Sequence, residues 1–134
     1  MVLLLCALPC FEGFAQEQEE PDIYEIIEKE TNRLQSMLNL EDWQVFYVDS
    51  TLMHNIPAMQ QEIMKLQKAR VENISIYQSI QDKWTEATDR SYEKFFNSDQ
   101  WKKYLKSGGE RAQKQRDKRK GINTKPSKKD KRKK

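Results

Sequence analysis

The sequence predicts an all-α protein whose elongated helical hairpins are built on one long central helix. In residues 57–96, apolar side chains from Met59 to Phe95 recur every three or four positions and form one stripe at helical spacing. No Gly or Pro interrupts residues 58–96, and the helix formers Gln, Glu, Lys and Ala fill many remaining positions. A helix of this length would span about 60 Å. It can bury its stripe only against the rest of the chain or against a second copy.

The N-terminal segment, residues 1–15, has the features of a signal peptide. Residues 2–11 form an apolar run too short to cross a bilayer core of ~30 Å. Gly13 and Ala15 are small residues at the positions that signal peptidase inspects, so we expect cleavage before Gln16 and a periplasmic or secreted protein. No basic residue precedes the run, and the alternative is a frayed apolar N-terminus of a cytosolic protein. Both cysteines lie in this segment, so the processed chain would have no thiol for a disulfide, a metal site or a nucleophile.

A helical domain is expected over residues 22–107, after an acidic lead-in at residues 16–21. Asp22 is a suitable N-cap for a first helix over residues 23–38, because a short acidic side chain can accept hydrogen bonds from the free backbone N–H groups. Asn39 is a suitable residue to end this helix.

The second helix, predicted over residues 41–55, is apolar on two faces. One face carries Trp43, Phe46, Tyr47, Met53 and His54, and the opposite face carries Val45, Val48, Leu52 and Ile56. Either both faces are buried in a core, or one is reserved for a partner, and the sequence leaves both open. Pro57 is expected to end this helix and to be the first residue of the central helix. The alternative is one kinked helix that continues through Pro57.

A last short helix is predicted over residues 99–106. Ser98 is a suitable N-cap, and the pair Gly108 and Gly109 is expected to end the helix.

The charge distribution predicts a separate C-terminal tail. Residues 102–134 hold 16 Lys and Arg against 3 Asp and Glu, a net charge of +13, whereas residues 16–101 hold 8 against 17, a net charge of −9. Residues 108–134 are therefore predicted to be a basic, largely disordered tail, of which residues 110–119 can extend the last helix. Such a tail can contact polyanions nonspecifically or simply keep the protein soluble. The candidate polyanion-binding residues are Arg111, Lys114, Arg116, Lys118, Arg119 and Lys120.

The sequence offers little that could support catalysis. It has a single histidine, His54, with no cysteine nearby and no obvious further metal ligand. It contains no glycine-rich phosphate loop, nucleophile elbow or HExxH pattern. We therefore predict a protein that is not an enzyme and that needs neither a metal nor another cofactor.

Two short stretches of the chain resemble each other. Leu40-Glu41-Asp42-Trp43-Gln44 and Phe96-Asn97-Ser98-Asp99-Gln100 each place an apolar residue, a polar residue, an acid and a glutamine at the opening of a helix. This arrangement resembles the twin L-T-x-x-Q motifs of the Spy/CpxP family of periplasmic proteins. The likeness covers most of residues 23–106, and it departs from the family pattern at Glu41, Phe96 and Asn97.

The resemblance implies a thin, curved, all-helical protein, commonly a homodimer, that binds unfolded or aggregation-prone proteins without ATP or acts in envelope-stress signalling. Flexible Met and aromatic side chains on a helix face suit such binding, because they adapt to many sequences. The candidate client-binding residues are Phe46, Met53, Met59, Met64 and Val71. The alternative is that most of them form the core, an interpretation that we favour for Met59 and Phe46. A purely structural helical subunit of an envelope assembly is a further possibility.

Overall fold

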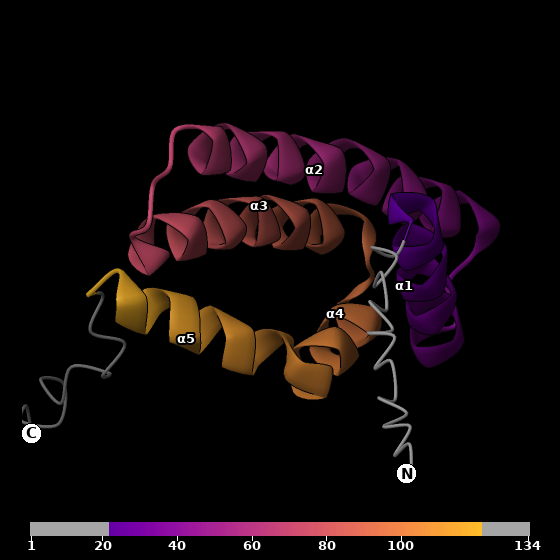
Figure 1. Cartoon of the computed structure of the whole chain (residues 1–134). Helices are drawn as coiled ribbons and strands as arrows, with labels where there is room; N and C mark the ends of the chain where they lie inside the picture. The colour runs from indigo at the N-terminus through magenta and orange to yellow at the C-terminus, as the bar shows by residue number, and fades with distance from the viewer. Residues whose placement is uncertain (1–21, 122–134) are drawn as a thin grey trace, which may run out of the picture.

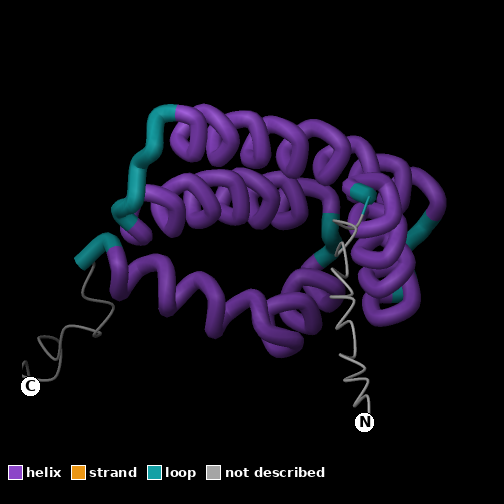
Figure 2. Tube along the Cα trace, viewed as in Figure 1, coloured by secondary structure: helices purple, strands orange, loops and turns teal. Residues whose placement is uncertain are grey.

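The computed structural model describes residues 22–121, which are helical throughout except for short connections and contain no strand (Figures 1 and 2). The elements are α1 (Ile23–Leu38), α2 (Asp42–Lys68), α3 (Ile74–Phe95), α4 (Ser98–Tyr104), the short π-helix η1 (Leu105–Gly109) and α5 (Glu110–Arg119). The predicted all-α fold is confirmed. The predicted signal peptide, the acidic lead-in and residues 122–134 lie outside the described residues. None of the helices within residues 22–121 is both long and apolar enough to cross a bilayer.

Helix α1 has the bounds that its capping residues predict. The Asp22 side chain accepts a hydrogen bond from the Tyr24 N–H (3.2 Å). Asn39 lies in the left-handed region (φ 51°), which asparagine tolerates better than most residues, and its N–H donates to the Gln35 carbonyl. The N-cap and the stop expected from the sequence are therefore both confirmed.

Helix α2 continues through Pro57, so the predicted helix boundary at this proline is wrong and the alternative of a helix that continues through it is the observed one. Figure 1 shows α2 as a single helix. A proline inside a helix removes one backbone hydrogen bond and costs about 3 kcal/mol or more. Packing of the helical turn before Pro57 opposes this cost. Leu52 is buried, and the Asn55 amide donates a hydrogen bond to the Thr88 hydroxyl of α3 (2.8 Å).

The predicted central helix over residues 57–96 is also wrong, because the chain turns between Lys68 and Ile74. Arg70 adopts a left-handed conformation (φ 55°), and the Val71 N–H donates back to the Leu66 carbonyl (3.0 Å). This is the Schellman ending of a helix, here with arginine where glycine is usual. Asn73 then caps α3 by accepting the Ser75 N–H (3.0 Å). The apolar stripe is thus divided between the two antiparallel helices of a hairpin.

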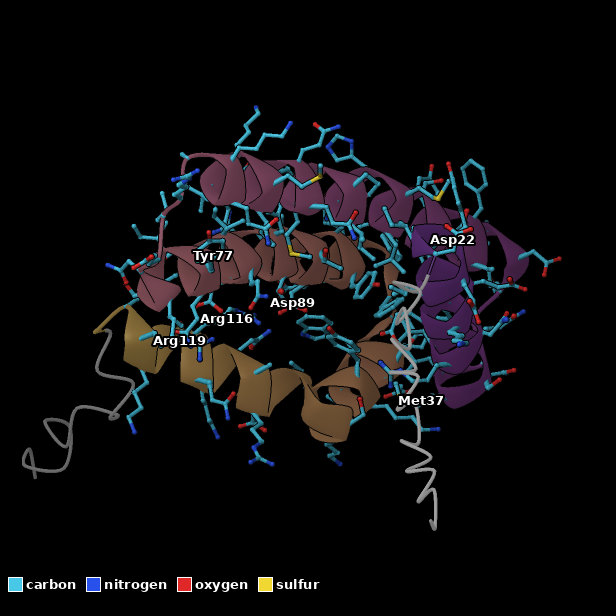
Figure 3. The ribbon with its side chains drawn as sticks, viewed as in Figure 1. Asp22, Met37, Tyr77, Asp89, Arg116 and Arg119 are labelled. Carbon is cyan, nitrogen blue, oxygen red and sulfur yellow. The ribbon has the colours of Figure 1, made fainter. Side chains whose placement is uncertain are left out.

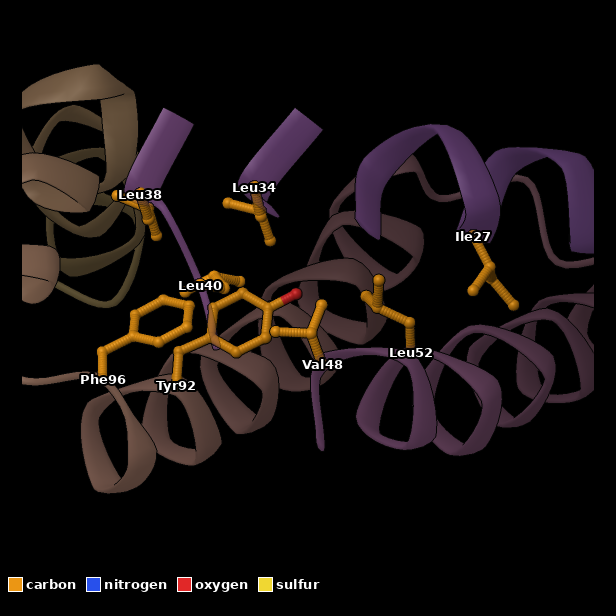
Figure 4. Packing of buried hydrophobic residues seen from close by; sticks show 8 residues of the cluster. All are labelled: Ile27, Leu34, Leu38, Leu40, Val48, Leu52, Tyr92 and Phe96. Carbon is orange, nitrogen blue, oxygen red and sulfur yellow. The ribbon is translucent and has the colours of Figure 1, made fainter. Parts of the chain in front are cut away.

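The core lies where α1 crosses the α2–α3 hairpin (Figure 4). Its buried apolar residues are Ile27, Leu34 and Leu38 of α1, Leu40, Val48 and Leu52 of α2 and its approach, and Tyr92 and Phe96 at the end of α3. Of the two apolar faces of α2, the one with Val48 and Leu52 is buried and the one with Phe46 is exposed.

The two similar helix openings meet in this core. Gln44 and Gln100 form a reciprocal amide pair, with Nε2–Oε1 distances of 2.6 and 3.0 Å. Each amide oxygen also accepts the backbone N–H that precedes its own helix, at Glu41 (3.0 Å) and Asn97 (2.9 Å). Asn97, rather than the predicted Ser98, is the N-cap of α4. The two stretches therefore bind each other as well as starting helices.

The predicted stop at Gly108 and Gly109 is wrong, because helical structure resumes beyond it. Gly108 has φ 136°, a conformation that suits only glycine, and it kinks the chain inside η1. A Cβ at Gly109 would lie 3.0 Å from the Tyr104 ring, so the kink is packed closely on that side chain. Helix α5 then runs back beside α3 (Figure 1). Residues 110–119 are thus helical rather than part of a disordered tail.

Candidate binding surface

The exposed face of α2 carries a cluster of aromatic side chains, which we call the aromatic face: Trp43, Phe46 and Tyr47. They are 49%, 66% and 51% exposed, and they contact each other edge to face, with Tyr47 placed between the other two. Tyr47 also stacks on Phe95 of α3 (5.7 Å between ring centroids). The spacing of three and four residues places all three on one side of the helix. They point outward because the opposite side, with Val48 and Leu52, is buried in the core.

A groove of about 640 Å³ runs between α1 and α2 and adjoins the aromatic face at Phe46. We call it the α1–α2 groove, and its lining residues are Tyr24, Ile27, Glu28, Thr31, Asn32, Asp42, Val45, Phe46, Asp49 and Met53. Ile27 is fully buried beneath it, whereas Tyr24, Phe46 and Met53 are exposed along it. The aromatic face therefore continues at Phe46 into a groove lined by both apolar and polar side chains.

The structure brings together only two of the five predicted client-binding residues, Phe46 and Met53. Met64 is exposed farther along α2, Met59 is half-buried between α2 and α3 beside Trp84, and Val71 is half-buried in the turn before α3. The preference for Phe46 in the core is wrong, since this side chain is among the most exposed. Tyr24 was not among the predicted client-binding residues, because its place in the groove with Phe46 depends on how α1 crosses α2.

The basic side of α5 contacts acidic residues of α3 in an arrangement that we call the clasp. Arg116 pairs with Asp89, and both side chains are about 95% buried. The Tyr104 hydroxyl donates to the other Asp89 oxygen (2.7 Å). Arg119 forms two hydrogen bonds to Asp82 (2.6 and 2.8 Å). Figure 3 shows Arg116 and Arg119 on the side of α5 that faces α3.

The outer part of the clasp is electrostatically favourable. Hydrogen bonding from Arg119 lowers the pKa of Asp82, and hydrogen bonding from Lys120 lowers the pKa of Glu86. Lowered carboxyl pKa values mean that these pairs stabilise the fold at neutral pH and stop doing so as the pH falls through the folded-state values.

The clasp changes the interpretation of the predicted polyanion-binding residues. Arg116, Arg119 and Lys120 pair with α3, and Lys114 pairs with Glu110 of its own helix (2.6 Å). Among the described residues, only Arg111 and Lys118 of the predicted set form no ion pair. Polyanion contact through the C-terminal part therefore stays a prediction, and it now rests mainly on these two side chains and on residues 122–134.

We expect the clasp and the core to weaken at alkaline pH through two tyrosines. Burial raises the pKa of Tyr92 and of Tyr104 above the ordinary value of 10, and for Tyr104 the hydrogen bond to Asp89 adds to the effect. Both remain protonated in the folded chain while the unfolded chain ionises. Stability is thus unaffected below pH 10 and falls above it, by about 1.4 kcal/mol per pH unit for each tyrosine. Urea unfolding between pH 9 and 11 measures this slope, and Tyr104→Phe should roughly halve it. An unchanged slope in the variant would contradict this assignment.

The described residues contain no group of three or more His, Cys, Asp or Glu side chains placed to hold a metal ion. His54 lies near the Trp84 ring (6.2 Å between centroids). Comparisons of the chain with protein-family models, with curated proteins and with solved structures find no match. The resemblance to the Spy/CpxP family stays a prediction.

Proposed function

We propose that this chain is an exported protein that binds unfolded or aggregation-prone polypeptides without ATP. The observation that supports it most directly is the exposed surface formed by the aromatic face and the α1–α2 groove. Monomeric proteins seldom leave several large apolar side chains exposed side by side, and such patches usually mark a binding site. Self-association as a homodimer remains part of the proposal, because a second copy could cover the same surface.

The chemistry of this surface suits partners of varied sequence. Trp43 and Tyr47 offer large, rigid contact areas that lose little conformational entropy on binding. Met53 adds an adaptable side chain that can fit differently shaped partners. Phe46, exposed by 66%, connects these residues to the groove. A binding site of this kind recognises apolar character rather than one particular sequence.

Suppression of client aggregation tests the proposal. We expect the mature chain to suppress light scattering by a heat-denatured client at equimolar ratio. The double variant Phe46→Ser/Met53→Ser should lose most of this activity. Both residues are exposed, so the variant should fold with a stability within about 1 kcal/mol of the native chain.

Met64→Ser/Ile74→Ser is the matched control. These side chains are 52% and 72% exposed, but they lie outside the aromatic face and the groove. The control should protect the client as well as the native chain does. An absence of protection by the native chain, or an equal loss in both double variants, would rule out this surface as the binding site.

A further inference from the structure

The rim of the α1–α2 groove is acidic. Glu28, Asp42 and Asp49 line it, and no Lys or Arg does. Other carboxylates of α1 have partners, since Glu25 pairs with Lys29 (2.9 Å) and Glu30 with Arg33 (2.7 Å). Within residues 22–121, the three rim carboxylates form no ion pair. The groove therefore presents unneutralised negative charge next to apolar side chains.

A second observation comes from the α1 side of the groove. Thr31 lines it and is 94% buried, yet its hydroxyl finds no hydrogen-bond partner among the described residues. A buried hydroxyl without a partner destabilises a folded chain, so most buried polar groups are paired. Because this oxygen is buried in the free chain, an occupant of the groove supplies the missing partner only when the side chains over it move aside.

We infer that the α1–α2 groove binds cationic polypeptide segments, in which Lys or Arg residues flank apolar side chains. This inference rests on the proposed function and specifies its client class. Apolar side chains of the client occupy the space between Tyr24, Phe46 and Met53. The client's Lys or Arg groups approach the rim carboxylates, and their aliphatic stems and charged heads pack favourably on the exposed aromatic rings. A client backbone group bonds the Thr31 hydroxyl after the side chains over it move aside.

Peptide binding to the full mature chain tests the charge preference. Two fluorescein-labelled peptides serve as probes, one alternating Leu and Lys and the other alternating Leu and Gln. By fluorescence anisotropy at low salt, the Lys peptide should bind at least tenfold more tightly. The double variant Asp42→Asn/Asp49→Asn should weaken the Lys peptide about three- to tenfold and leave the Gln peptide unchanged.

The variant Glu72→Gln/Glu93→Gln is the control for net charge. It neutralises two exposed carboxylates that form no ion pair within residues 22–121 and lie away from the groove. This variant should bind the Lys peptide nearly as well as the native chain does. Equal weakening by both charge variants would show a general effect of net charge and would overturn the inference.

The substitution Thr31→Val should change stability and peptide binding in opposite directions. Valine has nearly the same shape and removes the unpaired hydroxyl, so the melting temperature of the free chain should rise. The same change should weaken the Lys peptide about threefold or more, because the client loses its bond to the hydroxyl. Unchanged peptide binding in this variant would overturn the predicted role of Thr31.

Three outcomes separate this inference from the proposed function. Aggregation suppression together with equal affinity for both peptides would overturn the charge preference and leave the proposed function standing. Failure of both assays would overturn both proposals. A synthetic peptide of residues 122–134 that displaced the Lys peptide at lower concentration than other cationic peptides would show that the chain's own C-terminal segment occupies the groove. That result would overturn the assignment to an external client.

Discussion

Replacing Asp89 with alanine is expected to lower the free energy of unfolding by about 3–5 kcal/mol, a large part of the stability of a small domain. The substitution leaves the Arg116 guanidinium buried without a counter-charge and removes the acceptor of the Tyr104 hydroxyl. We expect α5 to detach from α3 in the variant. Urea unfolding measures the loss, and hydrogen exchange of the backbone amides in residues 110–119 shows whether α5 is released first.

Two comparisons make this prediction specific to a buried charge. Asp82→Ala breaks the Asp82–Arg119 pair, whose arginine is 41% exposed, and should cost only about 1 kcal/mol or less. The double variant Asp89→Leu/Arg116→Met removes both buried charges and should recover most of the stability lost by Asp89→Ala. A loss of similar size in Asp82→Ala, or no recovery in the double variant, would show that burial of the Asp89–Arg116 pair does not explain the loss of stability in Asp89→Ala.

The sequence correctly predicted the two ends of α1, which are capped by a residue's own side chain or backbone. Asp22 and Asn39 act as expected at the two ends of α1, because their short polar side chains meet backbone requirements that hardly depend on the rest of the fold. The similarity between the stretches around Gln44 and Gln100 also pointed to a real feature. What the sequence could not show is that the two stretches would meet, since they lie 56 residues apart.

The sequence predicted one central helix because the turn at residues 69–73 leaves the apolar periodicity unbroken. Arg70 takes a left-handed conformation that usually signals glycine, so no residue marked the end of α2. At Gly108 and Gly109 the error was the opposite one. The sequence predicted a helix end there, whereas the structure has a kink within helical structure. In both places, tertiary contacts rather than local sequence determine where helical structure ends. The α2–α3 hairpin buries Tyr92, and the clasp provides α5 with partners that a basic segment alone lacks.

The candidate surface was predictable in part. The two-faced character of α2 was visible in the sequence, and it left open whether the face of Trp43 and Phe46 is buried. The answer depends on α1, whose buried residues share the core with Val48 and Leu52, while Trp43, Phe46 and Tyr47 stay exposed. The acidic rim and the Thr31 hydroxyl come together only through this crossing. Residues from two helices form such a groove, so the periodicity of either helix alone cannot predict it.

The amide pair of Gln44 and Gln100 is expected to contribute as much to the fold as a large core residue does. Gln44→Ala should lower the free energy of unfolding by about 3 kcal/mol or more, because several buried groups lose their partners at once. The Glu41 N–H loses its acceptor (3.0 Å), the Phe95 carbonyl loses its donor (2.9 Å), and Gln100 loses half of its reciprocal pair. Gln100→Ala should have a similar effect through the Asn97 N–H (2.9 Å).

A double-mutant cycle separates this pair from two independent caps. If the amides act as one unit, the double variant Gln44→Ala/Gln100→Ala should be more stable than the sum of the single losses predicts, with a coupling free energy of about 1–3 kcal/mol. Gln35→Ala, at an exposed position of α1, should change stability by less than about 0.5 kcal/mol and controls for the loss of a glutamine from a helix. Urea unfolding at pH 7 measures all four variants. Additive losses at positions 44 and 100 would show that each glutamine merely caps its own helix and that the contact between the two helix openings adds nothing to the fold.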